Sequence, residues 1–177
     1  MLDAAGVACS AVKPDVDEAA VKDRSSDAVE IALELASAKA LSVGGAEAWV
    51  IGSDSVVSVD GRLFDKPAGR EDAAEHLRFF SGKTMQLTSA VALARGGKVD
   101  WRYVETARLQ VRPLSERFIA DYLDAEWPEV GYTVGVFRLE ARGVQLFESI
   151  RGDHFAILGM PLIPLLGALR ERGLIPA

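Results

Sequence analysis

The sequence has few of the residues that crosslink small folds or bind transition metals. It contains one cysteine, Cys9, and two histidines among 177 residues. A single cysteine excludes an intrachain disulfide and a multi-cysteine zinc site. We expect Cys9 to be a small core residue in an apolar stretch. His76 and His154 are far apart, and neither has a partner at the spacing of a metal site.

An excess of positive charge and long apolar runs are also absent. Lys and Arg number 20 against 26 Asp and Glu, which gives a net charge of −6. Broad surfaces for duplex DNA or anionic membranes need basic patches, so we expect neither partner, although a small phosphate-bearing ligand needs only a few lysines. No apolar run approaches the roughly 18 residues of a membrane span. Because the first residues also lack a signal-peptide pattern, we expect a cytoplasmic protein.

The length and the order of elements predict one α/β domain over residues 1–177. The chain is 49% hydrophobic and 26% charged, which is average for a globular protein. Apolar runs and helical stripes alternate along it, which favours the α/β class. The pattern predicts strands at about 7–12, 48–59, 87–94 and 99–111, and helices at about 26–41, 70–80, 115–127 and 161–171.

Several common catalytic motifs are missing. There is no phosphate loop ending in Gly-Lys-Ser or Gly-Lys-Thr, no Gly-x-Gly-x-x-Gly, no His-Glu-x-x-His and no Gly-x-Ser-x-Gly. Carboxylates and lysines near chain turns are the remaining candidates for chemistry.

Asp54 lies where carboxylates of α/β enzymes are commonly found. It follows Gly52 and Ser53 at the end of a buried-type strand, and the carboxyl ends of such strands often face a cleft. There it could bind a divalent metal or take a proton from water. Alternatively, it is a turn-forming aspartate that accepts hydrogen bonds from local amides.

Three other charged residues each have two interpretations. Lys66 precedes a proline and either contacts a phosphate or is an ordinary surface lysine. Glu18 lies in a polar loop and either binds Mg²⁺ or is solvated, and Lys39 either extends along the apolar stripe of its helix or reaches a cleft. Together with Asp54, these residues would fit metal-assisted chemistry on a phosphate.

Glu140 lies in an apolar neighbourhood between Phe137 and Phe147, and Glu148 directly follows Phe147. Burying an unpaired carboxylate costs on the order of several kcal/mol. We therefore expect at least one of the two to have a defined partner or ligand.

Ordered segments along nearly the whole chain carry a family resemblance. They are Pro14–Glu18, Leu35–Ala40, Val50–Val57, Asp60-Gly61 with Lys66-Pro67, Ser81-Gly82, Ser89–Leu93, and Gly152-Asp153 followed by Gly159–Leu162. Each segment alone is unspecific, but their order and spacing resemble the Maf family of nucleoside triphosphate pyrophosphatases.

The resemblance implies an elongated α/β fold shared with the inosine triphosphate pyrophosphatase superfamily, with a mixed sheet, flanking helices and two lobes around a cleft. It implies hydrolysis of a nucleoside triphosphate to monophosphate and pyrophosphate with a divalent metal, Mg²⁺ or Mn²⁺, and it suggests a homodimer. The family's general base falls on Asp54, which with Glu18 would bind the metal, and its phosphate-contacting lysines fall on Lys39 and Lys66.

The chain departs from the family pattern at its start. The family begins with a strand and a Ser-x-x-Arg-Arg phosphate loop, whereas Met1–Val7 matches the helix after that loop. Either the start was assigned too late and the protein is a normal enzyme, or the chain is a nucleotide-binding homologue with little turnover. The second alternative would fit a regulatory role in cell division, in keeping with the family's septum-formation label.

The expected specificity positions combine two subgroups. Ser55 after Asp54 resembles the Thr of the dTTP/UTP subgroup, whereas Glu140 resembles the Glu of the 7-methyl-GTP subgroup. A carboxylate can accept two hydrogen bonds from the Watson–Crick edge of guanine. Glu140 therefore favours a purine substrate such as 7-methyl-GTP.

Overall fold

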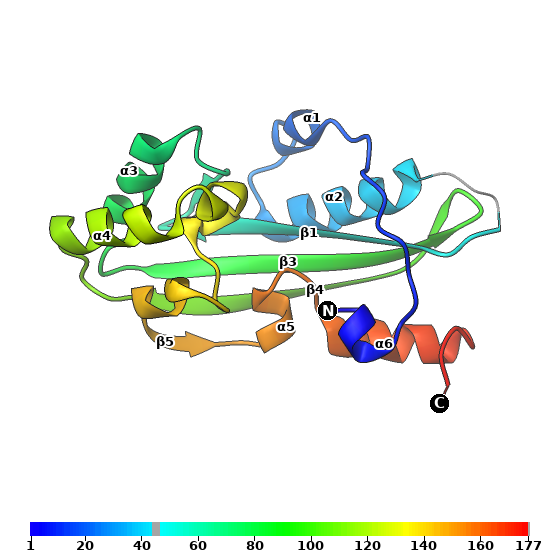
Figure 1. Cartoon of the computed structure of the whole chain (residues 1–177). Coiled ribbons are helices and arrows are strands. Elements are labelled where there is room, and N and C mark those ends of the chain that lie inside the picture. The colour runs from blue at the N-terminus through cyan, green and yellow to red at the C-terminus, as the bar shows by residue number, and fades with distance from the viewer. Residues whose placement is uncertain (44–46, 177) are drawn as a thin grey trace. The chain divides into compact units, whose positions relative to one another are not determined.

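The computed structural model describes residues 1–43 and 47–176. These residues form two compact units, each assembled from separate stretches of the chain. Unit 1 comprises Met1–Ser55, Ser89–Glu105 and Asp153–Ala177, and unit 2 comprises Val56–Thr88 and Thr106–Gly152. Three long strands contribute residues to both units, so the chain passes between them several times (Figure 1).

Five strands form one sheet in the order β2-β1-β3-β4-β5. They are β1 (Val50–Val59), β2 (Arg62–Phe64), β3 (Thr84–Arg95), β4 (Lys98–Val111) and β5 (Phe147–Arg151). Both pairs of described register, β1 with β2 and β4 with β5, are antiparallel. The α/β class is confirmed. The mixed sheet that we expected would also contain parallel strand pairs, and neither of these two pairs is parallel.

The helices fall into two groups by unit. Unit 1 contains η1 (Asp3–Ala5), α1 (Glu18–Lys22), α2 (Ala28–Ser42), α5 (His154–Ile157) and α6 (Leu162–Glu171). Unit 2 contains α3 (Arg70–Phe80), α4 (Glu116–Glu126), η2 (Glu129–Tyr132), η3 (Val134–Val136) and η4 (Arg142–Leu146). In the part of the chain that the structure describes, no helix is both long and apolar enough to span a membrane.

Local sequence signals account for several element boundaries. Asp60 and Gly61 have φ angles of 52° and 76° between β1 and β2, as a tight hairpin turn with an Asp-Gly sequence requires. The Ser115 hydroxyl oxygen accepts a hydrogen bond from the Phe118 amide and caps α4, as a serine before a helix commonly does.

The strand predicted at residues 7–12 is wrong. This segment has no regular secondary structure, and within it only Val7 is buried, against an apolar cluster that includes Leu93 and Leu165. Cys9 is exposed, so its assignment to the core is also wrong. A short apolar run becomes a strand only where the fold offers a partner and a core on one face, and this run has only one buried residue.

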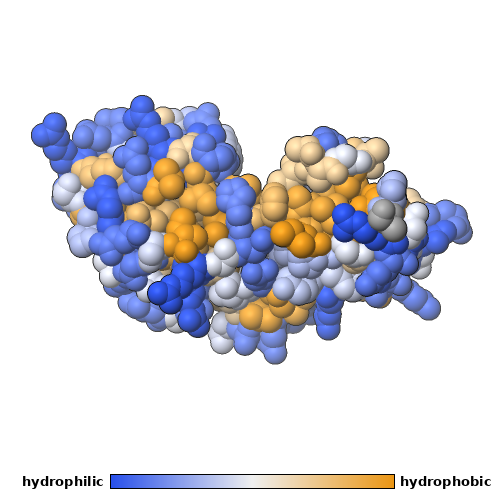
Figure 2. Space-filling model, turned by 90° about the horizontal axis from the view of Figure 1, so that it is seen from below, coloured by the Kyte–Doolittle hydropathy of each residue, from blue (hydrophilic) through white to orange (hydrophobic). Residues whose placement is uncertain are grey.

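Each unit has its own buried side chains. In unit 1, α6 packs Leu162, Leu165 and Leu169 against Val91 and Leu93 of β3. Apolar side chains also remain on the surface, and Figure 2 shows several such patches interrupted by polar groups on one face of the molecule.

Gly52 sets the approach of β1 to α2 within unit 1. A Cβ atom at this position would lie 2.2 Å from the carbonyl oxygen of Ala36 and 2.5 Å from the amide nitrogen of Ala40. Only a residue without a side chain allows this contact, since real Cβ atoms do not approach backbone atoms so closely. Asp54 lies two residues later on the same face of the strand, so the close approach brings it to α2.

We expect Gly52→Ala to lower the free energy of unfolding by about 3 kcal/mol, because either strand or helix must shift to relieve the overlap. Gly167→Ala is the matched control. Gly167 lies inside α6, and a Cβ there would meet no atom within 4 Å, so the substitution should stabilise the protein by about 0.5–1 kcal/mol. Urea unfolding of the two variants measures both values. Equal stability of Gly52→Ala and parent would contradict the packing argument.

Candidate functional site: a lysine between two carboxylates

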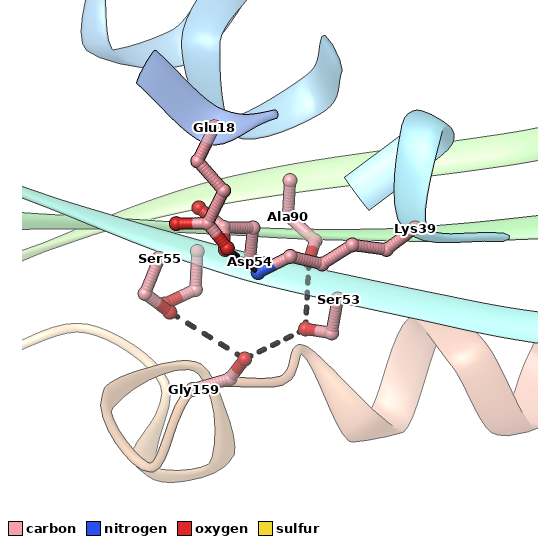
Figure 3. Close-up of polar contacts among 8 residues, drawn as sticks. Glu18, Lys39, Ser53, Asp54, Ser55, Ala90 and Gly159 are labelled. Atoms are coloured by element: carbon pink, nitrogen blue, oxygen red, sulfur yellow. Dashed lines mark hydrogen bonds and ion pairs between the residues drawn. The ribbon is translucent and has the colours of Figure 1, made fainter. Parts of the chain in front are cut away.

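Lys39 of α2 lies between two carboxylates in unit 1. Its ammonium nitrogen is 2.7 Å from Oε1 of Glu18 and donates a short hydrogen bond to Oδ1 of Asp54. Figure 3 shows the three side chains converging on one side of β1. The structure therefore brings together Glu18, Lys39 and Asp54, three of the residues singled out in the sequence.

Helix caps fix the two helices that carry Glu18 and Lys39. The Asp17 carboxylate accepts a hydrogen bond from the Ala20 amide at 3.1 Å and begins α1 at Glu18. Asp27 begins α2 in the same way, accepting from the amides of Val29 and Glu30. Caps of this kind satisfy the free amides of the first turn and hold the helix start in place.

The site is more buried at Asp54 than at Glu18. The exposed fractions of the side chains are 11% for Asp54, 18% for Lys39 and 44% for Glu18. Burial raises the pKa of the Asp54 carboxyl, although its hydrogen bond with Lys39 acts in the opposite direction. Burial acts to lower the pKa of Lys39, but the hydrogen bonds and charges of Asp54 and Glu18 outweigh it, so this pKa is raised. Lys39 therefore remains a cation next to a carboxylate with increased proton affinity.

Serines on both sides of Asp54 point to the other face of β1. The Ser53 hydroxyl lies 2.7 Å from the carbonyl oxygen of Gly159 and 2.8 Å from that of Ala90. The Ser55 hydroxyl lies 2.7 Å from that of Ser89. These contacts tie β1 to β3 and to the turn before α6 directly beside Asp54 (Figure 3). Ser55 thus has hydrogen-bond partners within the protein, and its role in specificity stays a prediction.

The remaining predicted site residues belong to unit 2. Lys66 is exposed beside the buried Pro67, between β2 and α3, and Glu140 is exposed between η3 and η4. Glu148 on β5 is exposed as well, so neither carboxylate is buried as the sequence argument assumed, and a partner or ligand for one of them stays a prediction. The buried carboxylate of this unit is Glu126, only 6% exposed.

The sequence analysis did not single out Glu126, although the sequence contains a signal that this carboxylate is buried. It follows Ile119, Tyr122 and Leu123 at helical spacing, on the face of α4 that the structure buries. A carboxylate that continues an apolar stripe is one that the fold must pair.

Oxygen ligands for a divalent cation are available at Glu18 and Asp54. No group of three or more His, Cys, Asp or Glu side chains suited to a metal occurs within residues 1–43 and 47–176. The two carboxylates nevertheless converge on one cation, the Lys39 ammonium. Such a pair fits Mg²⁺ or Mn²⁺, since Mg²⁺ sites commonly use one or two carboxylates, with water and substrate phosphates as the other ligands.

Comparison with known proteins identifies the family. A family model described as Maf-like protein matches residues 1–172. The chain is 45% identical over 179 residues to a nucleoside triphosphate pyrophosphatase of Nitrobacter hamburgensis, covering 99% of this chain and 89% of the relative. It is 43% identical over 183 residues to a 7-methyl-GTP pyrophosphatase of Rhizobium meliloti, covering 100% of this chain and 92% of the relative. The chain belongs to the Maf-like family, which confirms the resemblance drawn from its motifs.

We expect the pKa of Asp54 to lie above that of an ordinary aspartate and to respond in opposite directions to its two neighbours. Lys39→Met should raise it further, because the lysine favours the charged carboxylate. Glu18→Gln should lower it, because the Glu18 charge opposes ionisation. Titration of the Asp54 carboxyl carbon by NMR measures all three values, and equal titration in parent and both variants would contradict the assigned electrostatics.

The same shift has a consequence for stability. Because the folded pKa of Asp54 exceeds the unfolded one, its contribution to folding is present at acidic pH and is lost as the pH rises through the folded pKa. Asp54→Asn should remove this part of the pH dependence of the unfolding free energy.

Proposed function

We propose that this protein is a nucleoside triphosphate pyrophosphatase, which hydrolyses its substrate to a nucleoside monophosphate and pyrophosphate. The carrying observation is the Asp54 carboxylate, buried on β1 and bonded to Lys39. Relatives at 45% and 43% identity over nearly the full chain bear names for this reaction.

Asp54 is the general base in this proposal. As water attacks phosphorus, its proton passes to the Asp54 carboxylate while its oxygen forms the new phosphorus–oxygen bond. The bond to the departing pyrophosphate breaks, and pyrophosphate leaves with the electron pair. A carboxyl whose pKa is raised by burial takes a proton more readily than an exposed one, which suits this role.

Lys39 and Lys66 neutralise the substrate's phosphate oxygens in this proposal. Lys39 is a cation beside Asp54. A phosphate bound there would contact the Lys39 ammonium, which also binds the carboxylates of Glu18 and Asp54. Lys66 is exposed and lies beside the buried Pro67. A proline restricts the backbone conformation of the residue before it, which here is Lys66. Charge neutralisation of this kind lowers the energy of phosphoryl transition states.

Glu18 and Asp54 would hold a divalent cation, Mg²⁺ or Mn²⁺, through their carboxylate oxygens. When bound, such an ion withdraws charge from phosphate oxygens and helps to orient the substrate. Glu18 also holds the Lys39 ammonium at 2.7 Å, so it keeps the lysine directed toward Asp54.

Glu140 would recognise the base, and a purine such as 7-methyl-GTP is the proposed substrate class. Glu140 is exposed and therefore accessible to a ligand, and its carboxylate can accept two hydrogen bonds from the guanine edge. The Rhizobium meliloti relative is named for 7-methyl-GTP. Ser55 is the second proposed specificity position, acting through its contact with Ser89.

We expect Asp54→Asn and Glu140→Gln to fail in different ways on a panel of 7-methyl-GTP, GTP, dTTP, UTP and CTP with Mg²⁺. Asp54→Asn should lower kcat at least about a hundredfold on every nucleotide, because a general base is lost. Glu140→Gln should lower kcat/KM for 7-methyl-GTP about tenfold relative to UTP, because a charged acceptor becomes an amide. Pyrophosphate release measures both effects.

Glu148→Gln is the control for this panel, since Glu148 is an exposed carboxylate on β5 of the same unit as Glu140. It should match the parent on every nucleotide. Parent-like turnover in Asp54→Asn would remove Asp54 as the base. An unchanged preference in Glu140→Gln would remove Glu140 as the base-recognition residue.

A further inference from the structure

An ion pair in unit 2, between the buried Glu126 and the partly exposed Arg138, joins α4 to the segment that carries Glu140. Glu126 is 6% exposed and is the charged member of the buried polar side chains in the described part of the chain. Its Oε2 accepts a hydrogen bond from a terminal nitrogen of Arg138 at 3.0 Å. The bond crosses from the last residue of α4 to a loop residue two positions before Glu140.

Stability alone is a weak explanation for this pair. Glu126 loses nearly all of its contact with water, whereas the Arg138 side chain stays 33% exposed. Burying such a carboxylate costs free energy of desolvation, and apolar side chains of similar size often stabilise a protein equally well. The Arg138 Nε atom is also buried without a hydrogen-bond partner among the described residues. A polar contact with this cost is better explained by the conformation that it selects.

A second contact from α4 holds a strained turn of the same segment. The Tyr122 hydroxyl, one helical turn before Glu126, donates a hydrogen bond to the carbonyl oxygen of Val136 at 3.0 Å. Val136 has a φ of 57°, which a β-branched residue rarely adopts. Such a conformation costs on the order of 1–3 kcal/mol and persists only where neighbouring contacts enforce it.

A third contact closes the segment behind Glu140. A Cβ atom on Gly143 would lie 2.5 Å from the carbonyl oxygen and 2.7 Å from the amide nitrogen of Arg138. The Ala141 amide donates a hydrogen bond to that carbonyl at 3.2 Å. The backbone thus folds back on Arg138, and Glu140 is one of the residues of this turn, with its side chain exposed.

The charges around Arg138 agree with this arrangement. The hydrogen bond to Glu126 is the main cause of its raised pKa, and the charges of Glu129 and Glu140 act in the same direction. Glu140 therefore lies within electrostatic reach of the guanidinium that Glu126 holds.

We infer that Tyr122, Glu126 and Arg138 are positioning residues that hold the segment 135–143 in a strained shape and so determine how Glu140 meets the nucleobase. This inference rests on the proposed function and extends it from the residue that reads the base to the contacts that orient it. The three side chains themselves need not touch the substrate.

The test compares selectivity, defined as kcat/KM for 7-methyl-GTP divided by kcat/KM for UTP. The double variant Glu126→Met/Arg138→Met replaces the ion pair by apolar side chains, which should keep the Tm close to that of the parent. Tyr122→Phe removes only the hydroxyl that holds Val136. We expect each variant to lose selectivity at least fivefold through a higher KM for 7-methyl-GTP, with kcat for UTP unchanged.

Glu116→Met/Arg78→Met is the matched control. It removes the same two kinds of side chain, Glu116 from the first turn of α4 and Arg78 from α3. This pair is exposed, with nitrogen–oxygen distances of 2.8–3.0 Å. This control should retain the selectivity of the parent.

The outcomes separate the inference from the proposed function. A folded parent that releases no pyrophosphate from any nucleotide overturns the proposed function and the inference with it. An active parent whose selectivity survives in both Tyr122→Phe and the Glu126/Arg138 double variant overturns the inference alone, as does a parent without base preference. If the double variant does not fold, Tyr122→Phe decides the outcome by the same ratio.

Discussion

The contact between Lys39 and the two carboxylates depends on one close approach of backbone to backbone. Gly52 lets β1 lie against α2, where any Cβ would overlap the Ala36 carbonyl. Two residues later on the same face, Asp54 reaches Lys39, which also binds Glu18. The site thus follows from packing, because the absence of a side chain at Gly52 places a carboxylate where burial and a lysine together set its proton affinity.

Much of unit 1 could be predicted because its signals are local. The helix expected at 26–41 is found as α2, and in unit 2 the turn at Asp60 is likewise visible in the sequence. The expectation that Asp54 ends a strand is wrong, because β1 continues past it to Val59. The grouping of Lys39 with Asp54 was predictable only through the family resemblance. Fifteen positions separate them in sequence, and no helical or strand periodicity relates residues on two different elements.

Burial decided where prediction from sequence failed. Cys9 and Glu148 lie among apolar neighbours in sequence and yet are exposed, whereas Glu126 is a carboxylate and is buried. The apolar character of sequence neighbours does not by itself report which side chains of a segment pack inward. The strained φ of Val136 was equally unpredictable, since it depends on a hydroxyl from another helix.

The central claim is that Asp54 and Lys39 belong to a pyrophosphatase site. The identity of the reaction products tests this claim most directly. The parent chain would be incubated with 7-methyl-GTP and Mg²⁺ and followed by phosphorus NMR. The account predicts that 7-methyl-GMP and pyrophosphate accumulate in equal amounts. Release of inorganic phosphate together with the diphosphate, or unchanged nucleotide with a folded protein, would contradict it.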